Sequence, residues 1–381
     1  MEGLEMKVVV AIDSLKGSLS SMEAGLAVKE GVLLAHPDAD VTVKPLADGG
    51  EGTTDALIEG MGGERIDITV TGPLGKPVQA YYGYLKESKT AILEMASAAG
   101  IILVSNEEKD PLAATTFGVG EMILDAVNKG CRNFIIGIGG SATNDGGIGM
   151  LQALGYTFKD ADGHDVGQGA QALGKVAAIG CQGISSKLSE CHFQVACDVT
   201  NPLCGENGAT YIYGPQKGVT EDLKARLDAD MAHFAEVTSN ALGNHFANPD
   251  GAGAAGGLGF AFLSYLGAEL TPGIDLILNA VELEKELKDA DIVVTGEGRL
   301  DHQTAMGKAP VGVAKLAKKY GARVLAFAGG VTKDAKACNE AGIDAFFPIV
   351  RGIITLEEAM KPERARQNMI DSVEQVFRLF S

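Results

Sequence analysis

Most residues of this chain that could take part in catalysis or ligand binding lie in five clusters of glycine and polar residues. Each cluster follows an apolar run that is typical of a strand, and open parallel sheets bind ligands at the carboxyl ends of their strands. One such loop could be a plain strand-to-helix turn, but five loops that each carry a charged residue favour a binding site. The clusters are IDSLKGS (12–18), ADGGEGT (47–53), GIGGSATNDGG (137–147), ACDVTNP (196–202) and TGEGRLDHQT (295–304).

Acidic side chains in these loops are suited to phosphoryl transfer. That reaction needs a carboxylate to orient or deprotonate a hydroxyl, and further carboxylates to hold Mg²⁺ on phosphates. The alternative for any one of them is an Asx-turn or a helix cap, and for Asp145 the sequence does not separate the two interpretations. Asp198 follows the apolar run FQVAC and is the candidate base. The acidic candidates are Asp48, Glu51, Asp145, Asp198, Glu297 and Asp301.

The loop GIGGSATNDGG is the candidate phosphate loop. A strand that runs into glycines and then into a helix exposes several backbone N–H groups, and this geometry binds phosphate. The loop is not a Walker A motif, because GxxxxGK[ST] occurs nowhere in the chain. The segment GAGAAGG (251–257) satisfies GxGxxG, but no strand is predicted before it, so a dinucleotide-binding interpretation lacks its structural context.

Basic residues in these loops or in similar glycine-containing segments are candidate clamps for phosphate and carboxylate groups. They are Lys16, Lys217 and Arg299, whereas Lys308 fits a solvated surface lysine better. The net charge of −18 opposes nucleic-acid binding and means that an anionic ligand needs such a local group of cations. The six histidines form no spaced cluster that would indicate a metal site.

Alternating strand and helix patterns at both ends of the chain predict a doubly wound parallel sheet. Strands are expected at 7–12, 40–46, 291–298, 323–330 and 344–350, and a capping box at Ser20 and Glu23 should begin the first helix. One long helix is expected from about residue 355. Residues 68–85 have the pattern of a hairpin. We therefore expect residues 1–66 and 286–381 to form one discontinuous domain, with 67–285 as an inserted α/β domain.

The remaining features favour a cytoplasmic protein. The six cysteines include no CxxC pair, which fits reduced thiols, and neither a signal peptide nor an apolar run long enough to span a membrane is apparent. The sequence predicts no nucleic-acid or membrane partner, and it leaves open whether the chain forms a homo-oligomer.

The ordered series of motifs resembles the bacterial type I glycerate kinases over nearly the whole chain. Leu15 stands where a phenylalanine is expected, and MEGLE precedes a start at Met6. The motifs that carry the resemblance are IDSLKGSLS, PLADGGEGT, TVTGPLGKPV, ATTFGVGE, IGIGGSATNDGG, ACDVTNPL, GPQKG, GAGAAGG and VTGEGRLDHQT.

This resemblance implies ATP- and Mg²⁺-dependent phosphorylation of D-glycerate, usually to 2-phosphoglycerate, by a flavodoxin-like domain with a large inserted domain and a site between them. The alternatives are a non-catalytic sugar-acid or phosphate-binding protein, which would not need so many loop carboxylates, and a metal-dependent lyase or dehydrogenase. The expected catalytic residues are Lys16, Asp48, Asp198 and Arg299, and the expected Mg²⁺ ligands are Asp48 and Asp198. The residues expected to bind the nucleotide are Gly139, Gly140, Ser141, Thr143, Lys217 and Glu297. The residues expected to bind the substrate are Ser18, Glu51, Asn144, Asp145 and Asp301.

Overall fold

Two compact units make up the chain in the computed structural model, which describes residues 6–50 and 52–380. Unit 1 is formed by the described parts of Met1–Asp48, Asp55–Gly62 and Ile274–Ser381, and unit 2 by those of Gly49–Thr54 and Gly63–Gly273. The sequence-based boundaries were 66/67 and 285/286. Residues 274–285 group with unit 1, where Ile274 packs so closely on Gly312 that a side chain there would collide with it.

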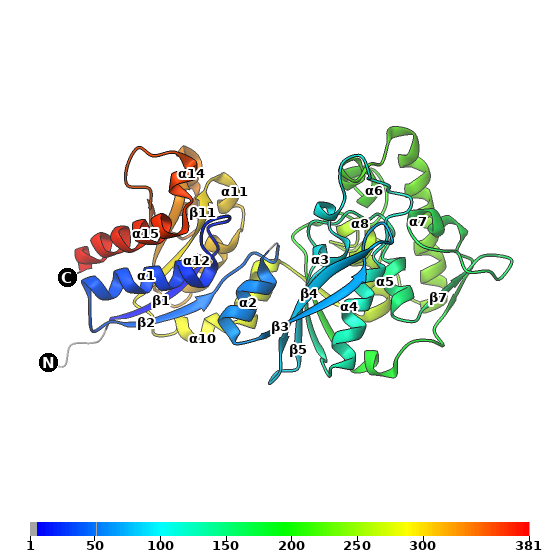
Figure 1. Cartoon of the computed structure of the whole chain (residues 1–381), viewed down its shortest axis with the longest axis horizontal. Helices are drawn as coiled ribbons and strands as arrows, with labels where there is room; N and C mark the ends of the chain where they lie inside the picture. The colour runs from blue at the N-terminus through cyan, green and yellow to red at the C-terminus, as the bar shows by residue number, and fades with distance from the viewer. Residues whose placement is uncertain (1–5, 51, 381) are drawn as a thin grey trace. The chain divides into compact units, whose positions relative to one another are not determined.

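Unit 1 is built on a five-stranded, all-parallel sheet (Figure 1). The spatial order is β13-β12-β11-β1-β2, which is the order 2-1-3-4-5 when the strands of this unit are counted along the chain. That is the flavodoxin-like order, so the predicted fold class is confirmed. The strands are β1 (Lys7–Ile12), β2 (Asp40–Pro45), β11 (Ile292–Leu300), β12 (Arg323–Val331) and β13 (Ala345–Pro348).

Apolar residues of the central strands and of the helices packed on them hold unit 1 together. Val8, Val10 and Ile12 of β1 pack with Val28 and Val373, which come from two helices that lie side by side, α1 (Ser21–Ala35) and α15 (Pro362–Phe377). The predicted capping box at Ser20 is present. The other helices of this part are α2 (Thr53–Met61), α9 (Gly273–Ala280), α10 (Leu283–Leu287), α11 (His302–Ala305), α12 (Ala309–Lys318), α13 (Ala337–Glu340) and α14 (Leu356–Ala359), with 3₁₀ turns at Lys333–Lys336 and Arg378–Phe380.

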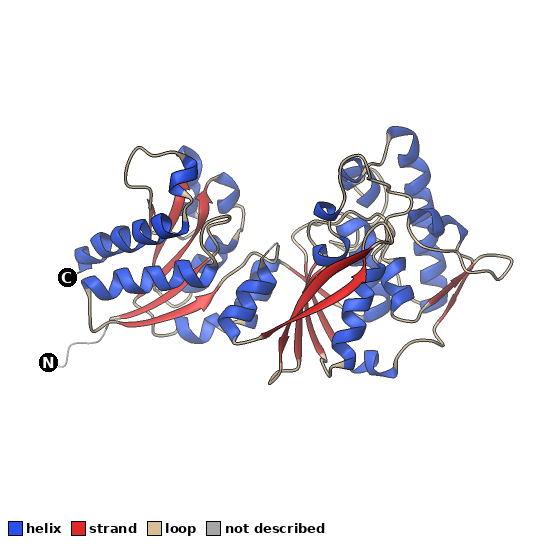
Figure 2. Ribbon diagram, in the orientation of Figure 1, coloured by secondary structure: helices blue, strands red, loops and turns tan. Residues whose placement is uncertain are grey.

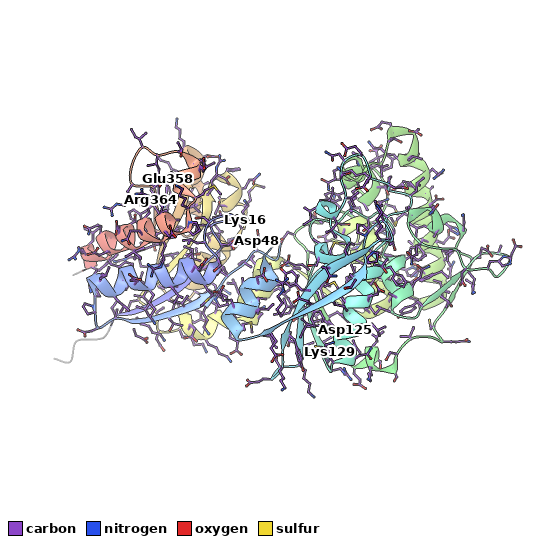
Figure 3. The ribbon with its side chains drawn as sticks, viewed as in Figure 1. Lys16, Asp48, Asp125, Lys129, Glu358 and Arg364 are labelled. Carbon is purple, nitrogen blue, oxygen red and sulfur yellow. The ribbon has the colours of Figure 1, made fainter. Side chains whose placement is uncertain are left out.

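The C-terminal segment is two helices, and the expectation of one long helix from residue 355 is wrong. α14 ends at Ala359, and α15 begins at Pro362, which lies in the first turn of that helix. Proline has no N–H to continue the preceding helix, but it fits the first turn of a new one. Arg364 Nη2 lies 3.4 Å from Glu358 Oε1 and so joins the two helices (Figure 3).

Unit 2 contains a six-stranded mixed sheet with helices packed against it (Figure 2). The predicted hairpin is the antiparallel pair β3–β4, while β5, β6, β9 and β10 pair in parallel. The strands are β3 (Glu64–Thr71), β4 (Pro77–Leu85), β5 (Thr90–Glu94), β6 (Asn133–Gly137), β9 (His192–Ala196) and β10 (Glu269–Thr271), with a separate pair β7 (Thr157–Lys159) and β8 (Ala178–Gly180). The helices are α3 (Ala96–Ala99), α4 (Phe117–Asn128), α5 (Ile148–Ala153), α6 (Ala209–Tyr213), α7 (Glu221–Leu242) and α8 (Ala254–Leu266), with 3₁₀ turns at 101–103, 170–175, 186–190 and 215–217.

Candidate active site

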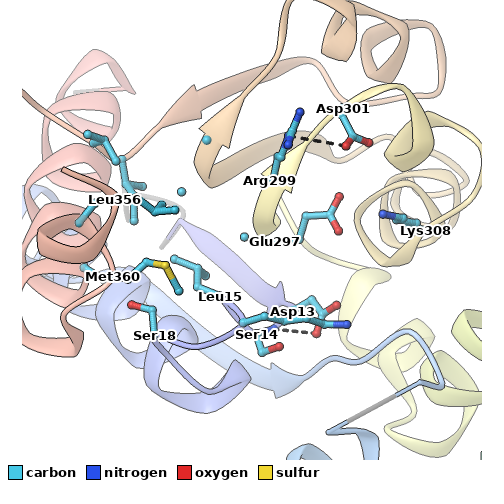
Figure 4. A pocket seen from close by; sticks show the side chains of 18 of the residues that line it. Asp13, Ser14, Leu15, Ser18, Glu297, Arg299, Asp301, Lys308, Leu356 and Met360 are labelled. Atoms are coloured by element: carbon cyan, nitrogen blue, oxygen red, sulfur yellow. Dashed lines mark hydrogen bonds and ion pairs between the residues drawn. The ribbon is translucent and has the colours of Figure 1, made fainter. Parts of the chain in front are cut away.

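A cavity of about 490 Å³ lies at the carboxyl ends of β1, β11, β12 and β13 in unit 1 (Figure 4). The strand order of this sheet reverses between β1 and β11, and open α/β sheets bind ligands at such a switch point. The cavity has a charged end and an apolar end. The charged end is Asp13, Lys16, Asp48, Glu297, Arg299, Asp301 and Lys308; the apolar end is Leu15, Ile349, Val350, Leu356 and Met360.

Asp13 is the most deeply buried carboxylate of the charged end. It directly follows β1, its side chain is only 6% exposed, its N–H donates to the Gly296 carbonyl (2.9 Å), and its Oδ1 accepts from Ser14 N–H (2.7 Å). Burial, reinforced by the negative charge of Asp48, raises its pKa to about 7. A carboxyl group that titrates near neutral pH is suited to accept a proton from a hydroxyl.

Glu297 is another carboxylate of the charged end; it is partly buried and lies in the C-terminal half of β11. Burial raises its pKa, although a hydrogen bond from the Thr304 hydroxyl and the nearby Lys308 ammonium lower it in part. The strand approaches β12 closely here, since a side chain on Gly296 would lie 1.9 Å from the Phe327 carbonyl oxygen. Glycine at this position therefore brings Glu297 to the cavity without a clash.

Three cations line the charged end. Lys16 and Arg299 are exposed, and Lys308 precedes α12. Lys308, which the sequence suggested to be an ordinary surface lysine, belongs to the cavity. Figure 3 labels Lys16 together with Asp48, another residue of the charged end. Lysine and arginine side chains in this setting can hold phosphate and carboxylate groups.

Asp301 has the alternative role that the sequence left open, because it caps a helix. Its Oδ1 accepts from the N–H groups of Gln303 (2.9 Å) and Thr304 (3.3 Å) at the start of α11, while Oδ2 lies 3.8 Å from Arg299 Nε. Ser18 also lines the cavity, and among the described residues its buried hydroxyl oxygen has no hydrogen-bond partner. The carboxylate therefore orients Arg299, and the hydroxyl is available to a ligand.

In unit 2, the Asp145 carboxylate of the predicted phosphate loop accepts hydrogen bonds from N–H groups of the same loop and of the helix after it. Asp145 is fully buried and accepts from Thr116 N–H (2.8 Å), Thr116 Oγ1 (2.9 Å), Gly147 N–H (3.1 Å) and Gly149 N–H (3.3 Å). The N–H groups at the start of α5 that were expected to meet phosphate therefore bind Asp145. This favours the structural interpretation of Asp145 over a contact with substrate.

Lys217, the other expected phosphate ligand in unit 2, is turned into the protein. It is 2% exposed, and its Nζ donates to the Thr143 carbonyl (2.6 Å) and to Ser141 Oγ (3.4 Å). Burial lowers its pKa to about 7, against an opposing effect of Asp145. Asn144 is also buried and donates to Thr210 Oγ1 (3.0 Å). Lys217 and Asn144 thus hold the loop in place in this structure.

Of the other expected residues of unit 2, Ser141 (5% exposed) and Thr143 (0% exposed) are buried, and the remaining described ones lie at the surface. Gly139 and Gly140 are exposed. Asp198 is exposed at the end of β9, and its Oδ1 accepts from Gly273 N–H (2.8 Å). It belongs to unit 2, whereas Asp48, the other expected Mg²⁺ ligand, belongs to unit 1. Glu51 lies outside the described residues.

The segment GAGAAGG has a packing role. Gly256 accepts a hydrogen bond from Gly146 N–H (2.9 Å), and a side chain on Gly256 would lie 2.1 Å from the Thr143 carbonyl oxygen. The positive φ values of Ala255, Gly256 and Gly257 bend the chain at the start of α8. These glycines allow two loops to meet, which explains the pattern without a dinucleotide.

Oxygen ligands for a divalent cation gather at the charged end. The carboxylates of Asp48 and Glu297 both raise the pKa of Asp13, which shows that negative charge is concentrated here, and hard cations such as Mg²⁺ prefer this donor type. A different group of three possible metal ligands in the described chain, Asp160, Asp162 and His164, lies on the turn after β7. No described helix is long and apolar enough to cross a membrane.

Asp13 and the apolar wall are the parts of the cavity that the sequence did not reveal as site residues. Asp13 carries the signal that singled out Asp198, an acidic residue directly after a strand, so the same rule could have found it. Leu356 and Met360 lie more than 300 positions further along the chain and have no motif. Only the fold brings them to the end of β1.

Comparisons with known proteins agree with this architecture. The model of the "Glycerate kinase family" matches residues 8–381. The chain is 49% identical over 356 residues to a glycerate kinase of Bacillus subtilis (strain 168) and 48% identical over 356 residues to a glycerate 2-kinase of Escherichia coli (strain K12), with 93% of each chain covered in both cases. A crystal structure from Salmonella typhimurium LT2, described as a glycerate kinase 2, superposes with a TM-score of 0.92 at 44% identity and covers 99% of this chain and 98% of its own. The chain is therefore a member of the glycerate kinase family.

Proposed function

We propose that this chain transfers the γ-phosphoryl group of ATP to D-glycerate and forms 2-phosphoglycerate. The observation that carries the proposal is the charged end of the cavity, where a buried carboxylate with a raised pKa lies among three cations at the switch point of the sheet. ATP and glycerate are both anions, and in a chain with a net charge of −18 these three cations can pair with their phosphate and carboxylate groups. The names of the similar proteins support glycerate as the acceptor.

Asp13 is the proposed general base. In the reaction the 2-hydroxyl of glycerate loses its proton to the Asp13 carboxylate, its oxygen bonds to the γ-phosphorus, and the bond from that phosphorus to the β–γ bridging oxygen breaks to release ADP. A pKa of about 7 lets Asp13 be ionised before the transfer and protonated after it. Asp198 of unit 2, the base expected from the sequence, stays a competing proposal.

We assign the three cations of the charged end to two anionic groups, the carboxylate of glycerate and the phosphates of ATP. The planar guanidinium of Arg299 matches a carboxylate with two parallel hydrogen bonds, and the Asp301 carboxylate near Nε orients it for the carboxylate of glycerate. Lys16 and Lys308 carry compact charges and are assigned to the phosphates. The Ser18 hydroxyl, buried without a described partner, can bond to either ligand.

Asp48 and Glu297 are the proposed ligands of Mg²⁺ within unit 1. When bound, Mg²⁺ would neutralise charge on the transferring phosphates. In unit 2, Asp198 stays a competing proposal for the metal, and Gly139, Gly140, Ser141 and Thr143 stay a competing proposal for the nucleotide.

A coupled assay of ADP formation with and without D-glycerate tests the activity, and phosphorus NMR of the product tests the position of transfer. Turnover that depends on both D-glycerate and Mg²⁺ and yields 2-phosphoglycerate is expected. Exclusive 3-phosphoglycerate would overturn the position but leave the kinase assignment intact. Binding of glycerate without any turnover would favour a non-catalytic sugar-acid-binding protein.

A further inference from the structure

The cavity of unit 1 is larger than a three-carbon acid requires, and its two ends differ in chemistry. Pockets of about 300–1,000 Å³ hold ligands of drug size, and this one measures about 490 Å³. In Figure 4, Leu15, Leu356 and Met360 lie on one side, while Asp13, Glu297, Asp301 and Lys308 lie on the other. A ligand that fills the cavity therefore needs an apolar part joined to an anionic part.

The apolar end suits a flat, uncharged ring. Met360 is flexible and polarisable and makes favourable contacts with aromatic rings. Leu356 is 75% exposed, so a ring that packs against it would remove apolar surface from water. Charged groups are absent from this end among the described lining residues, which would disfavour a phosphate or a carboxylate there.

The edge of β12 that lines the cavity offers backbone hydrogen bonds. The pairing of β12 with β13 runs from Leu325↔Ala345 to Ala328↔Pro348, so β12 continues past it through Gly330. An ideal Cβ on Gly330 would meet no protein atom within 4 Å, and its φ is not positive. Neither packing nor backbone strain explains this glycine, which leaves open space beside a strand edge that can pair with the polar edge of a ring.

We propose that the apolar end of this cavity binds the purine ring of the nucleotide, with its phosphates directed to the charged end. The inference rests on the proposed function, because a nucleotide is the phosphoryl donor there. It moves the base-binding site away from the glycine loop of unit 2, where Lys217 and the N–H groups of α5 already have protein partners. The donor and the acceptor then share one cavity, and the γ-phosphate meets glycerate beside Asp13.

Calorimetric binding of the non-hydrolysable analogue AMPPNP, with Mg²⁺ and without glycerate, tests the inference. Gly330→Val adds a branched side chain at a position where a Cβ meets no protein atom within 4 Å, and it should weaken AMPPNP binding at least tenfold. Leu356→Ala removes part of the apolar wall and should weaken AMPPNP binding several-fold while leaving the binding of inorganic tripolyphosphate unchanged. Ile353→Ala is the matched control, because Ile353 is fully exposed in the same segment and does not line the cavity.

Several results would overturn the inference. These are normal AMPPNP binding by Gly330→Val, equal effects of Leu356→Ala and Ile353→Ala, or no binding of AMPPNP by the wild-type chain. Weaker binding in Gly139→Val alone, where a side chain also meets open space, would instead place the nucleotide on the loop of unit 2. A protein that binds AMPPNP as expected but does not phosphorylate glycerate would keep this inference and reject the proposed acceptor.

Discussion

Replacing Asp13 by asparagine is expected to stabilise the folded protein at alkaline pH. The carboxyl pKa is about 7 in the folded chain against an ordinary value of 3.8. Below pH 3.8 both the folded and the unfolded chain hold this proton, so the ionisation of Asp13 does not change the free energy of unfolding there. As the pH rises from 3.8 to about 7, the folded chain keeps a proton that the unfolded chain releases, and stability is lost up to the folded pKa.

The size of the effect follows from the same values. At about 1.36 kcal/mol for each pH unit, the full cost above pH 7 is about 4 kcal/mol, of which roughly 1.6 kcal/mol is already present at pH 5. Asparagine keeps an oxygen that can accept the hydrogen bond from Ser14 N–H. The advantage of Asp13→Asn should therefore grow by about 2–3 kcal/mol between pH 5 and pH 8, which is roughly 5–10 °C in Tm for a domain of 150–250 residues.

The assay is a series of melting curves of both proteins in EDTA between pH 5 and pH 8.5. EDTA removes cations that would offset the charges of Asp48 and Glu297, and the neighbouring Lys16 is the same in both proteins. Asp38→Asn, in an exposed turn, is the control and should show no growing difference. A difference between Asp13→Asn and the wild type that stays constant with pH would refute the reasoning that burial and Asp48 raise this pKa.

Further predictions concern catalysis and the loop of unit 2. Asp13→Asn should lower kcat on the order of a hundredfold in the coupled assay, and a loss of that size in Asp198→Asn with near-normal kcat in Asp13→Asn would return the base to unit 2. Asp145→Ala removes the acceptor of four hydrogen bonds in a buried loop and should destabilise by about 3–5 kcal/mol in denaturant unfolding; a change below about 1 kcal/mol would contradict the role of that carboxylate. The stability of Lys217→Met relative to the wild type should fall as the pH rises from 7 to 10, because the wild type gains stability when its folded lysine, with a pKa of about 7, gives up the proton before the unfolded one does. Thermal melts of the two proteins at pH 7, 8.5 and 10 check this, and a difference that is independent of pH would count against a lowered pKa of Lys217.

Local signals in the sequence predicted the elements well. The capping box at Ser20 depends on residues three apart, and the β-branched run before Asp13 depends on neighbours, so both can be read without knowledge of the fold. The alternation of strand and helix predicted a parallel sheet, whereas the order of its strands was known only from the structure. Pro362 was also a local signal for a helix start, but the prediction of one long helix from about residue 355 did not use it.

The roles of individual carboxylates could not be predicted in the same way. Asp13 and Asp198 both follow a strand directly, but Asp13 is buried next to Asp48 and Asp198 is exposed. The groups that donate hydrogen bonds to the Asp145 carboxylate include the N–H of Thr116, which lies 29 positions earlier in the chain. Burial and distant partners decide whether a loop carboxylate is free to react, and neither quantity is contained in the spacing of a motif.

The adjacency of β1 and β11 has a consequence for how the protein folds during synthesis. Lys7 N–H donates to the carboxylate of Asp291, 284 positions later, at the start of that strand pair. At about 5–20 residues per second, the ribosome needs roughly 15–55 s to make the intervening chain. During that time β1 and β2 expose an unpaired strand edge, while the residues of unit 2 are complete and can fold first. Chaperones that cover exposed strands should therefore raise the yield of this protein mainly by binding its first 48 residues. Their binding to the much longer unit 2 should matter less.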